Sequence, residues 1–304
     1  MSKAVRNFLI LAAVLVIVGA IIAGAGFAFG GLRSITLTKD GPIVIGTDSK
    51  DMVTVDESYK KITTLDVDMD LGEFKLVEGD SFSLKGRYTS GLQRYEISEN
   101  NGVLTIRAKQ ISRIGIGYMG VGGYHDQLTF TYPKGTKFDK VTIILALGSL
   151  EVRTLEVDAL DISLDAGALS GSKITADRFT ASLNLGSCDI SQLSVSGYTD
   201  LNLDAGGLTL SNATVGKLRV NTHLGSVDFS GKLTGDASFN LDLGSLTMKL
   251  DNAESDVSYF VSSDIGSITI NGKSRGNSVN STNNTATCTL DISLSMGSAN
   301  LRFK

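Results

Sequence analysis

The chain has 304 residues, 34 of them glycine, with 2 prolines, 2 cysteines and no tryptophan, and its formal net charge is −4. A hydrophobic content of 42% argues against a disordered chain, and two cysteines are too few for a disulfide framework. The near balance of 28 Lys and Arg against 32 Asp and Glu lacks the basic excess typical of nucleic-acid-binding proteins, so no nucleic-acid partner is expected.

The first segment in chain order is an uncharged apolar run from Phe8 to Phe29, FLILAAVLVIVGAIIAGAGFAF. As a helix, its 22 residues would span about 33 Å, enough to cross a hydrocarbon core of about 30 Å. We therefore expect a transmembrane anchor at 8–30. The alternative is a signal peptide cleaved within the small residues of AGAGFAFGG, although the apolar region of such a peptide is usually shorter.

Charges near this run predict the orientation of the chain. Lys3 and Arg6 precede it, and the positive-inside rule then places a short tail, residues 1–7, in the cytoplasm. The predicted localisation is the cell membrane, crossed once, with a linker at 31–54 and the rest of the chain outside the cytoplasm.

Residues 55–147 contain several alternating apolar and polar stretches separated by turns. Turn residues occur at 78–80 (Glu-Gly-Asp), 100–102 (Asn-Asn-Gly) and 133–135 (Pro-Lys-Gly). These signals predict an irregular set of β-strands. We expect this region to begin the sheets that follow and to cap their first regular coil.

A glycine-centred repeat occupies residues 148–304. From Gly148 to Gly244 the glycines are separated by 19, 19, 20, 19 and 19 residues, and the next two intervals are 22 and 31. A fixed period near 20 is the signature of a stacked array. The predicted corner glycines are Gly72, Gly148, Gly167, Gly186, Gly206, Gly225, Gly244, Gly266 and Gly297.

Apolar side chains recur at fixed distances from these glycines. They fall five, three and one residues before the glycine and two and four residues after it, as in FNLDLGSLTMKL at 239–250. This is the period-2 alternation of a strand, reset at the glycine. We expect two strands joined at a glycine corner, with the apolar side chains of both facing inward, including Leu185, Leu224 and Leu243.

The repeat predicts an all-β fold, a single-stranded β-solenoid with coils of about 19–20 residues that stack in parallel in chain order. An antiparallel meander with the same period is the structural alternative. Near the end of the array, the polar segment 271–286 (NGKSRGNSVNSTNNTA) predicts a loop within the last coil.

The anchor, the segment TFTYPKGTKFDKVTI and the following LxLGSLxV-like repeats resemble the Toastrack family of adhesin-like bacterial proteins. The resemblance covers roughly residues 55–304. It implies an extracytoplasmic, right-handed β-helix-like fold, often encoded near cell-envelope stress systems, in a family of largely unknown function. It supplies no catalytic residues.

The position two residues before the corner glycine is polar in most repeats. In a parallel stack its side chains would form an outward row with about 4.8 Å between neighbours, where adjacent carboxylates repel. We favour charge management on a solvated face, because Asn184 and His223 separate aspartates in this row. The alternative is weak divalent-cation binding by the aspartates, since Ca²⁺ prefers oxygen ligands. The candidate ligands are Asp165, Asp204, Asp242 and Asp264.

The remaining sequence motifs do not predict a catalytic or cofactor-binding site. Residues 115–120 match GxGxxG, but a predicted strand follows in place of the required helix, so a loop is expected. Tyr118, Met119 and Tyr124 on this loop are candidate partner contacts. Cys188 falls in an apolar column and is expected in the core, so a disulfide with Cys288 is disfavoured. No catalytic or cofactor-binding residue is predicted.

These observations favour a β-repeat protein that is not an enzyme, is anchored in the membrane and lies mostly outside the cytoplasm. We expect it to act as an interaction module, either adhesin-like or associated with cell-envelope stress. Its expected partners are the bilayer, through residues 8–29, and an envelope protein, a wall polymer or a lipid headgroup. One alternative is an extracellular polysaccharide-acting β-helix enzyme, although the short turns between Gly148 and Gly244 leave little room for cleft-forming loops. The other alternative is a passive spacer.

Overall fold

The computed structural model describes residues 34–38, 41–45, 52–89, 94–109 and 126–304. They belong to two units. The smaller contains an antiparallel pair, β1 (Ser34–Thr38) and β2 (Gly41–Ile45), and the larger contains the described residues from Val53 onward. The predicted anchor at 8–30 lies outside the described residues. Within the described ranges, no helix combines the length and apolar character needed to cross a bilayer.

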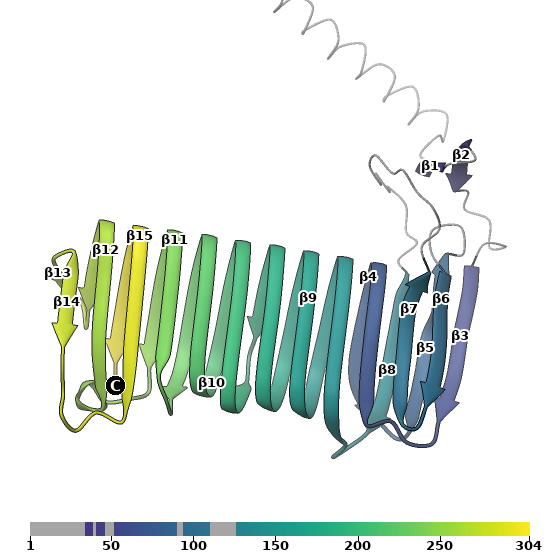
Figure 1. The fold of residues 1–304 in the computed structure, drawn as a ribbon, viewed down its shortest axis with the longest axis horizontal. Helices are drawn as coiled ribbons and strands as arrows, with labels where there is room; N and C mark the ends of the chain where they lie inside the picture. Colours follow the sequence, from purple (N-terminus) through teal and green to yellow (C-terminus); the bar gives the residue numbers. More distant parts are fainter. Residues whose placement is uncertain (1–33, 39–40, 46–51, 90–93, 110–125) are drawn as a thin grey trace, which may run out of the picture. The chain divides into compact units, whose positions relative to one another are not determined.

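The larger unit is built from strands that hydrogen-bond into one continuous sheet wound into a stack of coils (Figure 1). Apart from the short 3₁₀ turn η2 (Glu254–Asp256), its elements are β3 (Met52–Tyr59), β4 (Thr64–Gly79), β5 (Phe82–Thr89), β6 (Arg94–Asn100), β7 (Val103–Lys109), β8 (Gln127–Pro133), β9 (Lys137–Ile190), β10 (Leu193–Leu233), β11 (Ala237–Leu250), β12 (Val257–Ile270), β13 (Lys273–Arg275), β14 (Ser278–Ser281) and β15 (Cys288–Phe303).

The long elements β9 and β10 each pass through more than one coil, and neighbouring coils pair in parallel. Gly206 pairs with Gly186 between β10 and β9, and Gly225 pairs with Gly244 between β10 and β11. The pairing therefore repeats at the 19- to 20-residue period of the sequence. This confirms the predicted parallel stack of coils and excludes an antiparallel meander for these strands.

The core lies inside the coils and consists of columns of apolar side chains. The positions five and three residues before the corner glycine are buried, as are the positions two and four residues after it, in nearly every coil. Leu164, Leu183 and Leu203 form part of one such column, and Cys188 is buried in another beside Leu169 and Leu208. The alternation therefore predicted four of the five inward positions correctly.

The fifth position, directly before the glycine, contradicts the prediction. Leu185 is 59% exposed, Leu224 58% and Leu243 45%, although all three were expected to face inward. The corner is the reason. Between the inward residue three before the glycine and the inward residue two after it, the chain turns through four residues that are not buried. A bend of this length places two successive side chains on the outer surface, which a straight strand cannot do.

The corner glycines form a column in which each backbone lies directly against the next. Gly206 has φ +147°, and a Cβ added to it would lie 1.6 Å from the carbonyl oxygen of Gly186. The same contact recurs between successive coils through the whole column, with distances of 1.6–1.8 Å from Gly148 onward. The sequence requires glycine here for two reasons, the positive φ and the close stacking of one corner on another.

Thr222 interrupts the leucine column three residues before the glycine. It is 3% exposed, and its hydroxyl has no hydrogen-bond partner. Replacing it with the isosteric valine should increase the free energy of unfolding by about 1 kcal/mol, because a buried hydroxyl without a partner is costly. Urea titration of the full chain would measure this. Thr247→Val, at a half-exposed outer position, is the control, and equal shifts for both variants would contradict the explanation.

The coils are not stacked in chain order at one end of the array, contrary to the prediction. β15 pairs in parallel with β11 on one side and with β12 on the other, so the coil of Gly297 lies between those of Gly244 and Gly266.

Asp236, before β11, accepts hydrogen bonds from the backbone N–H and hydroxyl of Thr289. These bonds hold the pKa of Asp236 below its usual value, so their contribution to stability is lost as acid protonates the carboxylate.

The other end of the stack is closed by the irregular region. β4 pairs with β9 in the register of the repeats, Gly72 opposite Gly148, so it forms a regular coil despite a separation of 76 residues. On its far side β4 pairs in parallel with β7 and β8, and β5 and β6 add antiparallel strands. The region thus starts the same sheet, as the sequence predicted.

The polar segment 271–286 is more ordered than a simple loop. It contains β13 and β14, which pair antiparallel with β12 and cover the edge of the outermost coil. The edge strands are short and carry Lys273 and Arg275, both exposed. Short, charged edge strands discourage pairing with a further chain, which is how many β proteins end a sheet.

Candidate interaction surfaces

The polar row two residues before each corner glycine is exposed along most of the stack, as the sequence predicted. Neighbouring side chains in it interact. The Asn184 amide donates to an Asp165 oxygen at 3.1 Å, and His223 Nδ1 lies 3.0 Å from an Asp204 oxygen. On the other side, His223 Nε2 lies 3.8 Å from an Asp242 oxygen. A single imidazole therefore bridges two carboxylates from the coils above and below.

We call this set of nine positions the aspartate row. In spatial order it alternates strictly between an aspartate and a residue without a carboxylate: Asp70, Ala146, Asp165, Asn184, Asp204, His223, Asp242, Ser295 and Asp264. The insertion of β15 completes the alternation, because Ser295 separates Asp242 from Asp264, which are adjacent repeats in the sequence. The arrangement keeps carboxylates out of neighbouring coils and supports charge management on a solvated face.

The same alternation weakens the divalent-cation interpretation. Among the residues that the structure describes, no three His, Cys, Asp or Glu side chains gather closely enough to hold a metal ion. Asp165, Asp204 and Asp242 each have a neighbour without a carboxylate on both sides, and Asp264, at the end of the row, has Ser295 as its one neighbour. We therefore do not propose a metal site here.

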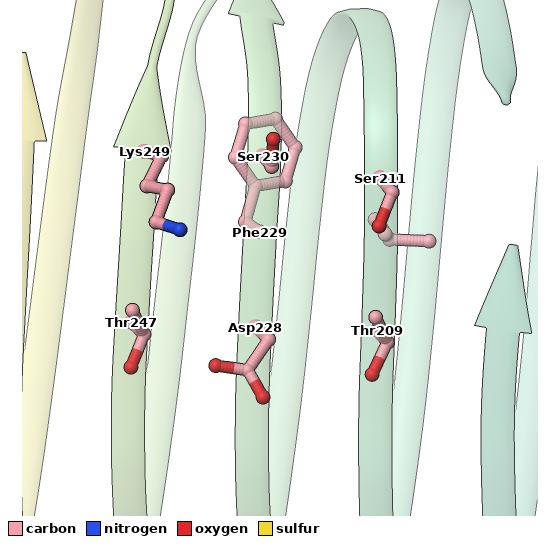
Figure 2. A pocket seen from close by; sticks show the side chains of 8 residues that line it. Thr209, Ser211, Asp228, Phe229, Ser230, Thr247 and Lys249 are labelled. Carbon is pink, nitrogen blue, oxygen red and sulfur yellow. The ribbon is translucent and has the colours of Figure 1, made fainter. Parts of the chain in front are cut away.

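A shallow depression lies on the outer face of the strands that follow the corner. It has a volume of about 350 Å³ and extends over three neighbouring coils, those of Gly206, Gly225 and Gly244. Figure 2 shows its polar side chains in two rows across these strands. The lining residues are Thr209, Leu210, Ser211, Asp228, Phe229, Ser230, Thr247 and Lys249.

The chemistry of the depression is that of a polar contact surface. Its outward side chains supply four hydroxyls, one carboxylate and one ammonium group, whereas the side chains of Leu210 and Phe229 are buried beneath it. Hydroxyls both donate and accept hydrogen bonds, and a carboxylate accepts them. Regular spacing at the coil repeat, about 4.8 Å, suits an extended ligand that repeats polar groups along its length.

The sequence interpretation did not single out this surface. The available signal was weak: the positions three and five residues after the glycine are polar in three consecutive repeats, as on any solvated strand face. Tyr118, Met119 and Tyr124, which the sequence favoured as partner contacts, lie outside the described residues together with the glycine motif at 115–120.

The two cysteines are expected to have low reactivity. Both are free thiols and both are buried, so the disfavoured disulfide is not formed. Burial raises the pKa of the Cys188 thiol to about 12, and it also raises the pKa of Cys288. Since the thiolate is the reactive form, both side chains should resist thiol reagents while the chain is folded.

The chain is similar to one protein family and to several proteins of known structure. The family model described as Toastrack DUF4097 matches residues 62–302. A proposed adhesin from Bacteroides fragilis is 12% identical, with a TM-score of 0.45, and the match covers 84% of this chain and 98% of that one. A proposed lipid-binding protein from Parabacteroides distasonis is 10% identical, with a TM-score of 0.45 and the same coverage. No curated protein matches the sequence of this chain.

Proposed function

Because the chain belongs to the Toastrack family, whose model matches residues 62–302, we propose that it is a non-enzymatic, adhesin-like interaction module of the cell envelope. In this proposal residues 8–29 anchor the chain in the membrane, and the stack of coils lies outside the cytoplasm. Its ligand is a polyhydroxylated polymer of the cell wall, held along the face that contains the depression.

The depression is the observation that supports this proposal. A polymer of sugars presents hydroxyls at regular intervals, and Thr209, Asp228 and Thr247 offer complementary groups on three successive coils. Each hydrogen bond contributes only about 1 kcal/mol after its competition with water. Affinity for such a ligand therefore arises from repetition along the stack and is modest for any short fragment.

A sedimentation assay with purified cell-wall polysaccharide and the full chain in a neutral detergent tests the proposal. The triple variant Thr209→Ala, Asp228→Ala and Thr247→Ala should bind about tenfold more weakly, which corresponds to the loss of one to two net hydrogen bonds. The wild-type chain should bind long polymers more tightly than oligosaccharides of two or three sugars.

The three coils also provide a matched control. Asn202, Asn221 and Asn240 lie on the strand before the corner and hydrogen-bond to one another through their amides. Their replacement by alanine removes three polar side chains from the same coils but leaves the depression intact. If both triple variants, with unchanged circular dichroism, lost binding equally, the depression would not be the contact surface.

A further inference from the structure

The exposed apolar side chains of the described residues are concentrated in one row. We call the position directly before the corner glycine the apolar ridge. It includes six large exposed residues, with exposures of 45–62%: Leu147, Leu185, Leu224, Leu243, Met296 and Ile265. Four of them, Leu224, Leu243, Met296 and Ile265, lie in consecutive coils without interruption. A soluble surface normally scatters such residues, so a continuous row indicates a contact.

Two polar rows of different character flank the ridge. On one side is the aspartate row. On the other, directly after the glycine, is a row that we call the serine row, in which the four consecutive coils just named carry Ser226, Ser245, Ser298 and Ser267, all exposed. The ridge thus separates a line of hydrogen-bond acceptors, the carboxylates, from a line of hydroxyl donors.

From this arrangement we infer that the ridge is the contact between two parallel copies of this chain. A two-fold axis along the stack brings ridge against ridge at the same coil and turns the serine row of each copy toward the aspartate row of the other. Ser245 then lies on the same side of the contact as Asp242 of the second copy, and Ser267 on the same side as Asp264 of that copy. An antiparallel pair instead places the two aspartate rows on the same side, where the carboxylates repel.

The dimensions of the surface indicate how strong this contact is. Nine coils at about 4.8 Å give a length of about 38 Å, and four residues at about 3.3 Å each give a width near 10 Å. Each copy therefore buries on the order of 400 Å², about 800 Å² in total, which is typical of weak and transient contacts. Association then depends on local concentration, which anchoring of both copies in one membrane would raise. The inference does not require the polymer contact.

Cysteine crosslinking of the full chain in native membranes tests the inference, and the two buried native thiols leave a clean background. Under mild oxidation, Leu224→Cys and Leu243→Cys should each form a disulfide-linked homodimer. Lys249→Cys, exposed in the same coil as Leu243 but away from the ridge, should give at most about a tenth of that yield. Adding Leu185→Asp to Leu224→Cys should lower the dimer yield severalfold, because it introduces two more carboxylates into the contact.

The ends of the ridge distinguish the two orientations. In a parallel pair, Leu147→Cys and Ile265→Cys each crosslink when expressed alone. Crosslinking only when the two variants are mixed indicates an antiparallel pair and overturns the inference. Equal yields at the ridge and at Lys249→Cys also overturn it. A third result would also overturn the inference: a ridge cysteine that forms no dimer and reacts with aqueous maleimide only after the membrane is disrupted. In that case lipid covers the ridge. A crosslink solely to a different protein has the same consequence.

Discussion

Gly206→Ala is expected to lower the free energy of unfolding by at least about 3 kcal/mol. The positive φ alone costs a residue with a side chain about 1–3 kcal/mol. The added Cβ would also lie 1.6 Å from the carbonyl oxygen of Gly186, so the two coils must separate at their corner. Because every corner rests on the next, the displacement propagates along the glycine column.

The neighbouring residue is the control for this prediction. A Cβ on Gly207 would meet only the Ser226 hydroxyl oxygen, at 3.8 Å, which is ordinary contact. Gly207→Ala should therefore change stability by less than about 0.5 kcal/mol, as expected for a surface substitution. Urea titration monitored by circular dichroism compares the two variants. Similar stabilities for both would show that the close stacking of corners is not a constraint.

Leu203→Asp is the second substitution with a large expected effect. Leu203 is 2% exposed, and its coil is covered by a neighbour on each side. The change removes a buried leucine, which costs about 2–5 kcal/mol, and places a carboxyl group in an apolar column. We expect loss of the cooperative unfolding transition, extending beyond the substituted coil, because coils of a stack stabilise one another.

Leu185→Asp tests the same chemical change at an exposed leucine. Leu185 lies in the adjacent coil but is 59% exposed, so its replacement should cost less than about 1 kcal/mol. Limited proteolysis and thermal melts of the two variants, measured side by side, would show whether the two positions differ in their contribution to stability. A Leu185→Asp variant as unstable as Leu203→Asp would mean that the residues before the glycines belong to the core after all.

Much of the fold could be predicted from the sequence because every repeat has the same pattern of apolar residues and glycine, so the pattern is seen many times. Each coil needs inward apolar side chains on both strands and a glycine at the corner, and a single exception such as Thr222 does not obscure the column. The position of Cys188 in the core followed from its neighbours in the alignment of repeats. These features are local to one coil and its sequence register.

The ridge could not be predicted, because a leucine in the core and a leucine on the ridge are the same residue in the same alternating pattern. Only the geometry of the corner distinguishes Leu183, which is buried, from Leu185, which is exposed. The position of β15 was also inaccessible. The coils of Gly266 and Gly297 carry similar patterns, so the sequence alone does not specify which of them pairs with β11.

The candidate site was predictable only in part. The aspartate row was identified because its residue types are distinctive, and its alternation explains the placement of Asn184 and His223. The depression has no distinctive residue types, since threonine and serine occur on any outward strand position. Its existence depends on how three coils lie together, which is a property of the stack.

The position of β15 has a consequence for how the protein is made. During translation β12 emerges before Cys288–Phe303, so until those residues are synthesised β11 and β12 have no coil between them. A chain whose synthesis stops before Cys288 therefore lacks the native partner of one edge of β11 and of one edge of β12. Unpaired strand edges favour aggregation of an incomplete chain, and the order of the coils makes completion of this stack dependent on translation through β15.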